Sequence, residues 1–372
     1  MHIGVPKEIK IHEYRVGLVP GSVRELIHHG HTVSVETGAG LGVGISDDDY
    51  TAVGATIIGS AKDIFDTADM IVKVKEPQPE ECAMLREGQV LFTYLHLAAD
   101  EAQTRALIDS GCIAIAYETV TDRAGRLPLL APMSEVAGRM SVQVGAHYLE
   151  KEQGGAGILL GGVPGVPAAN VVVVGGGVSG TNAARMAMGM EAKVTVIDKS
   201  LDRLTTLDMQ FGPTLNTIYS TVDNLERYVS DADLVVGAVL VPGAAAPKVI
   251  TRDIVKSMRP GSVFVDIAID QGGCSETSKP TSHSDPVYTV DGVVHYCVTN
   301  MPGAVARSST FALNNATLPF AVELANSGYR KALANNLNLA NGLNIHAGRV
   351  TYKAVATTFG LDYIPTEEAL RL

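Results

Sequence analysis

Tryptophan is absent from this chain of 372 residues, and aromatic residues make up only 5% of it. A core without large rings must be filled by aliphatic side chains, and hydrophobic residues do make up 46% of the chain. Together with 19% charged residues, this composition is typical of an α/β protein. The chain is too long for one compact core, so we expect two domains.

Cysteine is also scarce. The four cysteines lie far apart and form no C-x-x-C pair, which indicates neither a disulfide framework nor a zinc site. We therefore expect reduced thiols in the core of a cytoplasmic protein. They are Cys82, Cys112, Cys274 and Cys297.

Long apolar runs and basic clusters are missing as well. The uncharged stretch 153–184 is interrupted by Pro164, Pro167 and many glycines, so it falls short of the roughly 20 apolar residues of a spanning helix. Residues 1–15 carry charges throughout, which argues against a signal peptide. The net charge of -11 and the lack of a Lys/Arg cluster argue against a nucleic-acid partner. We predict neither a membrane nor a nucleic-acid partner.

Segments typical of strands and helices alternate along the chain, and the alternation occurs twice. The first series contains "HIGVPKE", "HTVSVET", "MIVKVK" and "QVLFTYLHL", and the second contains "ANVVVVGGG", "AKVTVIDK", "ADLVVGAVLVPG" and "GSVFVDIAID". Strand, helix, strand order implies parallel pairing with right-handed crossovers. We predict an α/β fold of two doubly wound, Rossmann-like domains with parallel sheets, joined by long helices around a cleft.

Two pairs of segments from the two halves also resemble each other, "ADMIVKVKEP" with "ADLVVGAVLV" and "GQVLFTYLHL" with "GSVFVDIAID". Chance similarity among valine-rich strands is the alternative explanation. A helical segment, 131–155, is expected to bridge the domains, and no further strand is expected after residue 305. We predict a discontinuous first domain, 1–128 plus 305–372, and a second domain, 129–304.

The strongest motif lies in the second half. Gly175, Gly177 and Gly180 have G-x-G-x-x-G spacing, directly after four valines and before a predicted helix. Such glycines let a backbone approach a pyrophosphate, whose charge the helix N-terminus stabilises. The next strand ends at Asp198, which can bind the ribose and repels a 2′-phosphate, so we predict NAD over NADP. A glycine-rich turn without a ligand is the alternative.

Ionisable residues follow four predicted strands, where ligands bind in open parallel sheets. Arg15 is suited to bind a substrate carboxylate, because its planar guanidinium group can donate two parallel hydrogen bonds to the two carboxylate oxygens. Lys75 ends one strand and His96 another, and an imidazole can exchange protons near neutral pH. Asp270 follows a strand of the second domain. We predict that these four residues carry the chemistry.

Each of these residues also has a simpler explanation. Arg15 could be a surface arginine, and His96 could be a buried imidazole whose hydrogen-bonding groups are paired within the core. Lys73 and Lys75 share a face of their strand, so at least one could extend to water at the strand end. We expect this for Lys73 and favour Lys75 as the functional lysine. Asp270 could cap the following turn.

Three histidines lie close together in "HHGH", residues 28–31. A metal site would require further ligands, and no carboxylate or thiol lies nearby in the sequence. Imidazoles at a helix end interact favourably with the helix dipole. We therefore predict no metal at these histidines.

The whole chain resembles the alanine dehydrogenase and transhydrogenase family. The resemblance rests on "GVPKEIKIHEYRVGLVPGSV", "VKVKEP", "TYLHLA", "LLGGVPGV", "VVVVGGGVSGTNAA", "DIAIDQGGC" and "VTNMPGAV". The chain departs from the family pattern at His12, Gly17 and Val19, where Asn, Ala and Ser or Thr are more frequent. These positions flank Arg15 without replacing it.

The resemblance implies roles for particular residues. Arg15 and Lys75 would bind the substrate carboxylate and carbonyl, while His96 and Asp270 would act in proton transfer. A homohexamer is implied, and Ser327 stands where some relatives have a magnesium-binding histidine, so no metal is predicted. The implied cofactor contacts come from Ser134, Gly175, Gly177, Val178, Ser179, Gly180, Asp198, Arg203, Ser220, Val239, Leu240, Ile267, Asp270, Val298, Asn300 and Met301.

The activity that the resemblance implies is the reversible, NAD-dependent oxidation of L-alanine to pyruvate, ammonium and NADH. The retained Arg15, Lys75 and His96 favour it over a transhydrogenase subunit, which needs no amino-acid pocket. A catalytically silent NAD-binding protein is the second alternative. Turnover with small amino acids would distinguish the three.

Overall fold

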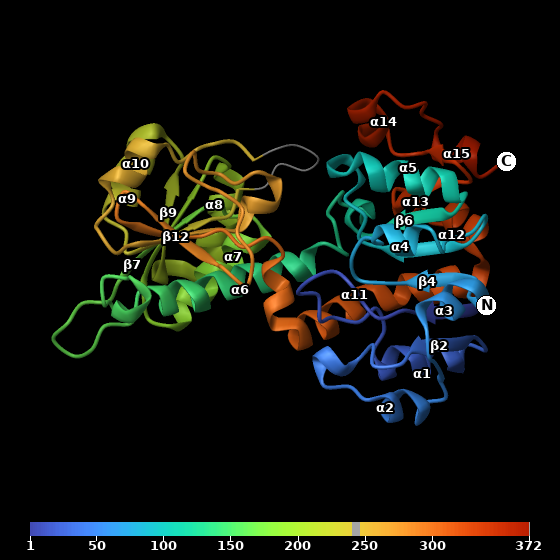
Figure 1. The fold of residues 1–372 in the computed structure, drawn as a ribbon. Coiled ribbons are helices and arrows are strands. Elements are labelled where there is room, and N and C mark those ends of the chain that lie inside the picture. The colour runs from blue at the N-terminus through green and yellow to red at the C-terminus, as the bar shows by residue number, and fades with distance from the viewer. Residues whose placement is uncertain (240–245, 372) are drawn as a thin grey trace. The chain divides into compact units, whose positions relative to one another are not determined.

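The computed structural model describes residues 1–239 and 246–371. The chain forms two compact units, of which unit 1 comprises Met1–Met133 and Val305–Leu372, and unit 2 comprises Ser134–Ala304. Each unit is a sheet with helices packed on it (Figure 1), so the predicted α/β class is confirmed. Among the described residues, no helix combines the length and apolarity needed to cross a membrane.

The sheet of unit 1 has eight strands in the order β15-β14-β6-β5-β4-β1-β2-β3. The six strands from the N-terminal part of the chain pair in parallel, as the alternation of strands and helices predicts. They are β1 (His2–Val5), β2 (Thr32–Glu36), β3 (Thr56–Ile58), β4 (Met70–Val72), β5 (Val90–Thr93) and β6 (Ile113–Ala116).

The helices of unit 1 are amphipathic or buried elements that cover this sheet. Pro20 begins the first of them, where a missing N–H costs nothing, and Gly30 follows its end with φ +84°. The helices are α1 (Pro20–His28), α2 (Asp47–Thr51), α3 (Ala61–Thr67), α4 (Pro79–Cys82), α5 (Glu101–Ser110), α11 (Ala306–Ser327), α12 (Tyr329–Asn335), α13 (Leu337–Ala340), α14 (Lys353–Phe359) and α15 (Thr366–Ala369).

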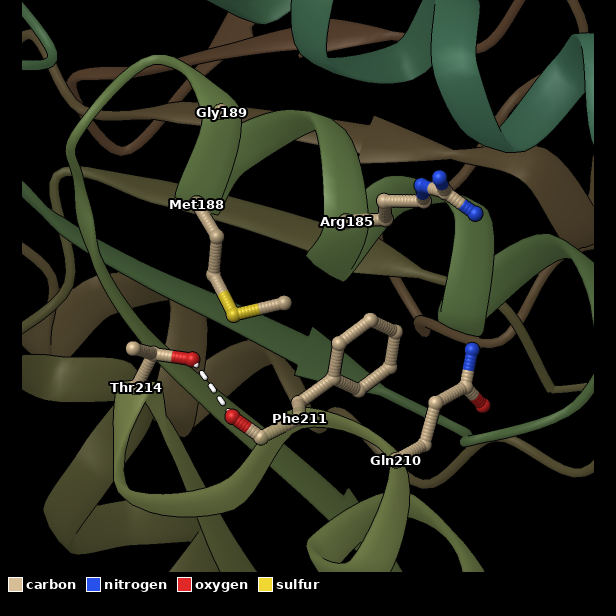
Figure 2. Close-up of a pocket in the computed structure, with 6 residues that line it drawn as sticks. All are labelled: Arg185, Met188, Gly189, Gln210, Phe211 and Thr214. Carbon is tan, nitrogen blue, oxygen red and sulfur yellow. Dashed lines mark hydrogen bonds between the residues drawn. The ribbon is translucent and has the colours of Figure 1, made fainter.

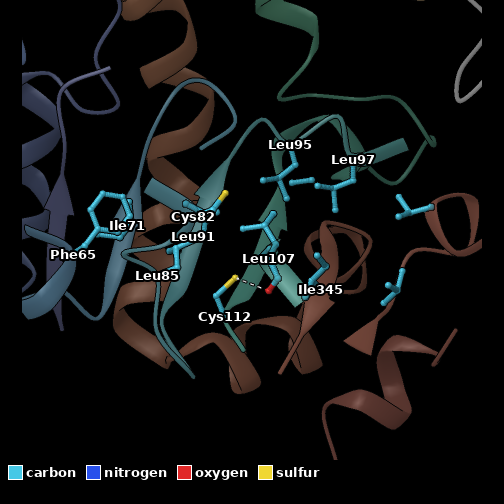
Figure 3. Close-up of a cluster of buried hydrophobic side chains, with 14 of the residues drawn as sticks. Phe65, Ile71, Cys82, Leu85, Leu91, Leu95, Leu97, Leu107, Cys112 and Ile345 are labelled. Carbon is cyan, nitrogen blue, oxygen red and sulfur yellow. Dashed lines mark hydrogen bonds between the residues drawn. The ribbon is translucent and has the colours of Figure 1, made fainter. Parts of the chain in front are cut away.

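The core of unit 1 lies between its central strands and the neighbouring helices. Strands β4, β5 and β6 are buried along their whole length, so both of their faces are covered. Figure 3 shows the cluster in which Phe65, Leu91, Leu107 and Ile345 pack together with two cysteines. All four cysteines of the chain are free and buried, which confirms the predicted core thiols.

The sheet of unit 2 has seven strands in the order β12-β13-β11-β10-β7-β8-β9. All pair in parallel except the edge strand β12 (Val287–Val290), which runs antiparallel to β13 (Val293–Tyr296). The others are β7 (Asn170–Val174), β8 (Lys193–Asp198), β9 (Leu215–Tyr219), β10 (Leu234–Gly237) and β11 (Val263–Asp266), and the helices are α7 (Val178–Gly189), α8 (Leu201–Phe211), α9 (Val222–Ser230) and α10 (Arg252–Ser257).

The structure corrects two predictions about strands. The sheets are not wholly parallel, because antiparallel strands are added at their edges. Strands also occur after residue 305, where none was expected. There β14 (Leu343–His346) pairs with β6, and β15 (Arg349–Val350) returns beside β14. These strands are short and the hairpin is tight, so the surrounding helical pattern concealed them.

One helix begins in unit 1 and continues in unit 2. It is α6 (Ala131–Tyr148), with Pro132 in its first turn. The predicted bridging segment extended to residue 155, whereas the helix ends at Tyr148 and a short 3₁₀ turn, Lys151–Gln153, follows. Glycines beyond that turn have positive φ angles, which a helix does not allow.

Candidate functional site

The turn between β7 and α7 has the geometry expected of the glycine motif. Gly175 has φ +101°, and a Cβ built on it would lie 2.6 Å from the Ala238 carbonyl oxygen. A Cβ on Gly180 would overlap the Gly175 carbonyl oxygen, whereas one on Gly177 would meet nothing within 4 Å. Two of the glycines therefore permit close backbone packing, and the third leaves open space beside the start of the helix.

Asp198 supports this turn directly. Its Oδ2 accepts a hydrogen bond from the Gly176 N–H at 2.6 Å, and its Oδ1 accepts one from the Ser200 N–H at 2.8 Å. Arg203 donates from Nε to the Gly176 carbonyl oxygen at 2.5 Å and from Nη2 to the hydroxyl of Thr181. Thr181 was not among the predicted residues, because nothing in its sequence context indicates a link to Arg203.

These residues fit a dinucleotide. The N-cap of α7 is Gly177, no side chain caps the helix, and its first turn carries no acidic residue. The backbone N–H groups at this end can therefore receive a pyrophosphate. The helix and the glycines before it match what a dinucleotide pyrophosphate requires.

The other predicted cofactor residues of unit 2 lie beyond the ends of its strands. Because the strands from β13 to β9 are parallel, their carboxyl ends lie along one edge of the sheet. Ser134 is in α6, and Leu240 lies outside the described residues. Ser220 and Ile267 directly follow β9 and β11, and Val239 and Val298 lie two residues beyond the ends of β10 and β13. Asn300 and Met301 come shortly after Val298.

Asp270 is exposed in the otherwise largely buried 3₁₀ turn, Ile267–Gln271, that follows β11. Buried Asp266 holds both ends of this turn, since it accepts hydrogen bonds from the N–H groups of Ala268 at 3.0 Å and Cys274 at 2.9 Å. Burial raises the pKa of Asp266 despite these donors. Asn300 donates a long backbone hydrogen bond of 3.4 Å to Asp270 Oδ1.

In unit 1, Arg15 is buried, with 2% of its surface exposed, and is not a surface arginine. Its Nε and Nη2 donate to the two carboxylate oxygens of Glu13 at 2.7 and 2.6 Å, and its Nη1 lies 3.0 Å from the sulfur of Met133. Burial lowers the pKa of Arg15, but Glu13, with smaller contributions from Tyr94 and Glu8, more than offsets this, so the pKa is raised. The guanidinium stays charged and fixed in orientation.

Gly17 lies in the loop after Arg15. A Cβ on Gly17 would overlap the carbonyl oxygen of Val72 in β4, so this loop packs directly on the strand. Asn314 of α11 ties the loop down, because it donates to the Gly17 carbonyl oxygen at 3.2 Å and accepts from the Val19 N–H at 2.9 Å. The departure from the family pattern at position 17 thus has a steric consequence.

The two lysines after β4 differ in their surroundings. Lys73 was expected to extend to water, but it is wholly buried, with its Nζ 3.1 Å from Glu8 Oε2 and 2.6 Å from Glu81 Oε1. The prediction was wrong because Glu8 lies 65 residues from Lys73 in the sequence, and only the fold places Glu81, eight residues away in α4, against the same ammonium group. Lys75 is partly exposed, and its Nζ is 3.9 Å from Glu76 Oε2.

His96 follows β5, has its side chain exposed, and is therefore not a core imidazole. Its ring stacks on that of Tyr94, with 5.8 Å between centroids and 12° between planes. Arg15 follows β1, Lys75 follows β4 and His96 follows β5, and these three strands are parallel neighbours. The fold therefore brings the three residues to one edge of the sheet in unit 1.

The three histidines of "HHGH" lie at the end of α1. His29 Nε2 is 3.4 Å from Glu25 Oε1, so a carboxylate does lie near these histidines, contrary to the expectation from the sequence. His31 Nε2 is 2.8 Å from Asn326 Oδ1. Ser327 is the last residue of α11. Within residues 1–239 and 246–371, no group of three or more His, Cys, Asp and Glu side chains is arranged to hold a metal.

A separate hollow lies on unit 2 between α7 and α8 (Figure 2). It lies toward the C-terminal end of α7, whereas the glycine turn precedes the N-terminal end. None of the predicted site residues lines it. Its lining consists of Arg185, Met188, Gly189, Gln210, Phe211 and Thr214.

The fold and the glycine turn define a two-unit, Rossmann-type nucleotide-binding protein. Residues 4–137 match the family described as "Alanine dehydrogenase/PNT, N-terminal domain", and residues 141–353 match "Alanine dehydrogenase/PNT, C-terminal domain". The chain belongs to the alanine dehydrogenase/PNT family.

Similar proteins extend over the whole chain. An alanine dehydrogenase of Halomonas elongata is 63% identical over 98% of both chains, and one of Methanococcus maripaludis is 55% identical over 100% of both. A solved L-alanine dehydrogenase has 54% identity and a TM-score of 0.94, covering 97% of this chain and 99% of its own. A transhydrogenase from Sinorhizobium meliloti has 27% identity and a TM-score of 0.81, covering 95% of this chain and 100% of its own.

Proposed function

We propose that this protein is an L-alanine dehydrogenase, which converts L-alanine, NAD and water to pyruvate, ammonium and NADH, and catalyses the reverse reaction. The observation that carries the proposal is the 63% identity with an alanine dehydrogenase over 98% of both chains. The three ionisable residues at the sheet edge of unit 1 support it, because an amino acid requires both cationic and proton-transferring groups.

Unit 1 is the substrate-binding unit in this proposal, and unit 2 binds NAD. Arg15 and Lys75 would hold the substrate carboxylate and carbonyl, and the fixed guanidinium reduces the motion lost on binding. Holding the substrate in one orientation makes the reaction effectively unimolecular. Arg15 owes this rigidity to Glu13.

His96 and Asp270 would transfer protons while water adds to the imine of the substrate. An imidazole can accept a proton from water and return it to the leaving amine near neutral pH. Bound NAD would supply the hydride acceptor. The proposed cofactor residues are those at the carboxyl edge of the sheet in unit 2, with Gly175, Gly177, Gly180 and Asp198 at their centre.

We also propose that the protein is a cytoplasmic homohexamer without a metal. Family resemblance supports the hexamer, which size-exclusion chromatography with light scattering would measure. Activity that persists after treatment with a chelator would support the absence of a metal. A stable monomer would contradict the first statement, and loss of activity restored by magnesium would contradict the second.

The decisive experiment follows NADH absorbance with purified protein. We expect NADH formation from NAD and L-alanine, NADH consumption with pyruvate and ammonium, and slower turnover with glycine, L-serine or D-alanine. A transhydrogenase subunit would bind NADH but would not oxidise any amino acid. Absence of turnover with L-alanine would therefore refute the proposed activity.

A further inference from the structure

The backbone at His96 adopts a conformation that needs support from its surroundings. Its φ and ψ angles are 50° and 37°, in the left-handed region. A Cβ makes this region unfavourable, so non-glycine residues remain there only where other groups hold them. The turn that carries the predicted acid/base group is thus held under strain.

Glu118 is the residue that holds it. The His96 N–H donates to Glu118 Oε1 at 2.6 Å, and the Leu95 N–H lies 3.2 Å from both oxygens of the same carboxylate. Hydrogen bonds to an ionised carboxylate are shorter and stronger than those between neutral groups. One side chain therefore accepts two successive backbone N–H groups at the strained position.

The register of the sheet explains why Glu118 reaches this turn. Thr93 of β5 pairs with Ala116 of β6, and the strands are parallel. Two residues further along the chains are Leu95 and Glu118, which therefore lie side by side beyond the strand ends. Glu118 comes from the short 3₁₀ turn Tyr117–Thr119 and is 22 residues from His96 in the sequence.

The imidazole itself is held by different contacts. Tyr94, on which the His96 ring stacks, donates from its hydroxyl to the Leu129 carbonyl oxygen at 2.5 Å. Gln103 donates from Nε2 to the Leu95 carbonyl oxygen at 3.1 Å. The stacked ring and the carboxylate of Glu118 are thus linked only through the backbone of the turn, which Gln103 also supports.

We infer that Glu118 is a positioning residue for the proposed reaction, which fixes the His96 turn in its left-handed conformation so that the imidazole can transfer protons. The inference rests on the proposed function. Without the carboxylate, two N–H groups lose their acceptor, and the turn can relax to a right-handed conformation that displaces the ring. A displacement of about 1 Å at a reacting group lowers rates by about 100-fold.

The test compares Glu118→Ala with Glu118→Gln. We expect Glu118→Ala to lower kcat for alanine oxidation by about 10- to 100-fold, with the KM for L-alanine changed less than about twofold. Proton transfer should then limit turnover, so the solvent isotope effect on kcat should rise. Glu118→Gln should restore most of kcat, because a carboxamide oxygen can accept the same N–H groups.

Asp122→Ala is the matched control. Asp122 Oδ1 also accepts two backbone N–H groups, from Ala124 at 2.8 Å and Arg126 at 2.9 Å, in a loop that carries no predicted site residue. Its kcat and solvent isotope effect should stay at wild-type values. NADH binding, followed by fluorescence, should be unchanged in all three variants.

The inference would be overturned if Glu118→Ala had the kcat and the solvent isotope effect of the wild type. It would also be overturned if Asp122→Ala lost as much kcat as Glu118→Ala. If Glu118→Ala does not fold, Glu118→Asp replaces it in the test. This variant retains the charge but places the carboxylate one methylene further from the turn. It should still lower kcat, and its melting temperature should equal that of the wild type. A wild-type protein without turnover would refute the proposed function instead, so the two failures are distinguishable.

Discussion

Oε2 of Glu8 lies 3.1 Å from Nζ of Lys73, and solvent reaches neither group appreciably. The other oxygen of Glu8, Oε1, accepts a hydrogen bond from the Val74 N–H at 2.7 Å and lies 3.4 Å from the backbone nitrogen of Lys75. Burial raises the pKa of Glu8, while Lys73 opposes this effect. This buried pair holds the backbone that leads to the proposed substrate lysine.

Lys73→Met should destabilise the protein strongly, because it leaves Glu8 and Glu81 buried without a cation. Breaking a buried ion pair from one side costs about 3–5 kcal/mol. Urea denaturation should show this loss in the free energy of unfolding. Lys62→Met is the control, since Lys62 pairs with Asp66 on the exposed face of α3 and the variant should unfold at nearly the wild-type urea concentration. Equal losses in both variants would contradict the prediction.

Gly17→Ala should weaken substrate binding in this chain, even though Ala is more frequent than Gly at this position in the family, because the loop of this chain packs directly on β4. The new Cβ would overlap the Val72 carbonyl oxygen, so the loop that carries Arg15 must move away from β4. We expect the KM for L-alanine to rise by about tenfold, with NADH binding unchanged. Gly21→Ala is the control, because a Cβ there meets nothing within 4 Å and should leave KM as it is. An unchanged KM in Gly17→Ala would show that the loop adapts freely.

His96→Ala should lower kcat by about 100- to 10,000-fold, the usual contribution of general acid/base catalysis. NADH binding should persist, since the glycine turn and Asp198 belong to the other unit. Steady-state kinetics in both directions would measure the loss. His28→Ala, at the exposed end of α1, should retain wild-type activity. Near-normal turnover in the His96 variant would remove this residue from the mechanism.

Asp198→Ala should reduce the preference for NAD. The variant removes the charge that repels a 2′-phosphate and also the acceptor of the Gly176 N–H. We expect the ratio of kcat/KM for NAD to that for NADP to fall at least about tenfold. Asp202→Ala, in the first turn of α8, should leave the ratio unchanged. Equal use of both cofactors by the wild type would contradict the basis of this prediction.

Alkaline pH should destabilise the fold through its buried thiols. Burial raises the pKa of Cys112 from 9.0 to about 11, and that of Cys297 likewise. As the pH rises, the thiols ionise in the unfolded chain before they ionise in the folded protein. Their contribution to the free energy of unfolding is therefore complete below pH 9 and is lost as the pH rises to about 11. The melting temperature should fall across this range, and Cys112→Ala should reduce the slope. At pH 8, thiol reagents should react only after unfolding.

Most of this fold can be predicted from the sequence, because the patterns that indicate its strands and helices each lie within a short stretch of the chain. Valine-rich strands and a glycine motif reveal β7 and α7 within a short stretch, and Asp198 follows directly from the next strand. The supports of the proposed site are different. Glu8 lies 65 residues from Lys73 and Glu118 lies 22 from His96, and both become neighbours only through strand order and register. A single sequence contains no pairing pattern from which that order follows.

The discontinuity of unit 1 bears on how the protein is synthesised. Its strand β6 ends at Ala116, and its neighbour β14 begins at Leu343, so the segment of unit 2 leaves the ribosome between them. A nascent chain can complete unit 2 while β6 is still an open edge. An apolar edge exposed during translation invites pairing with other chains. The hairpin of β14 and β15 therefore covers a strand edge that is prone to aggregation during synthesis. Its removal should reduce the yield of soluble protein before it alters any catalytic group.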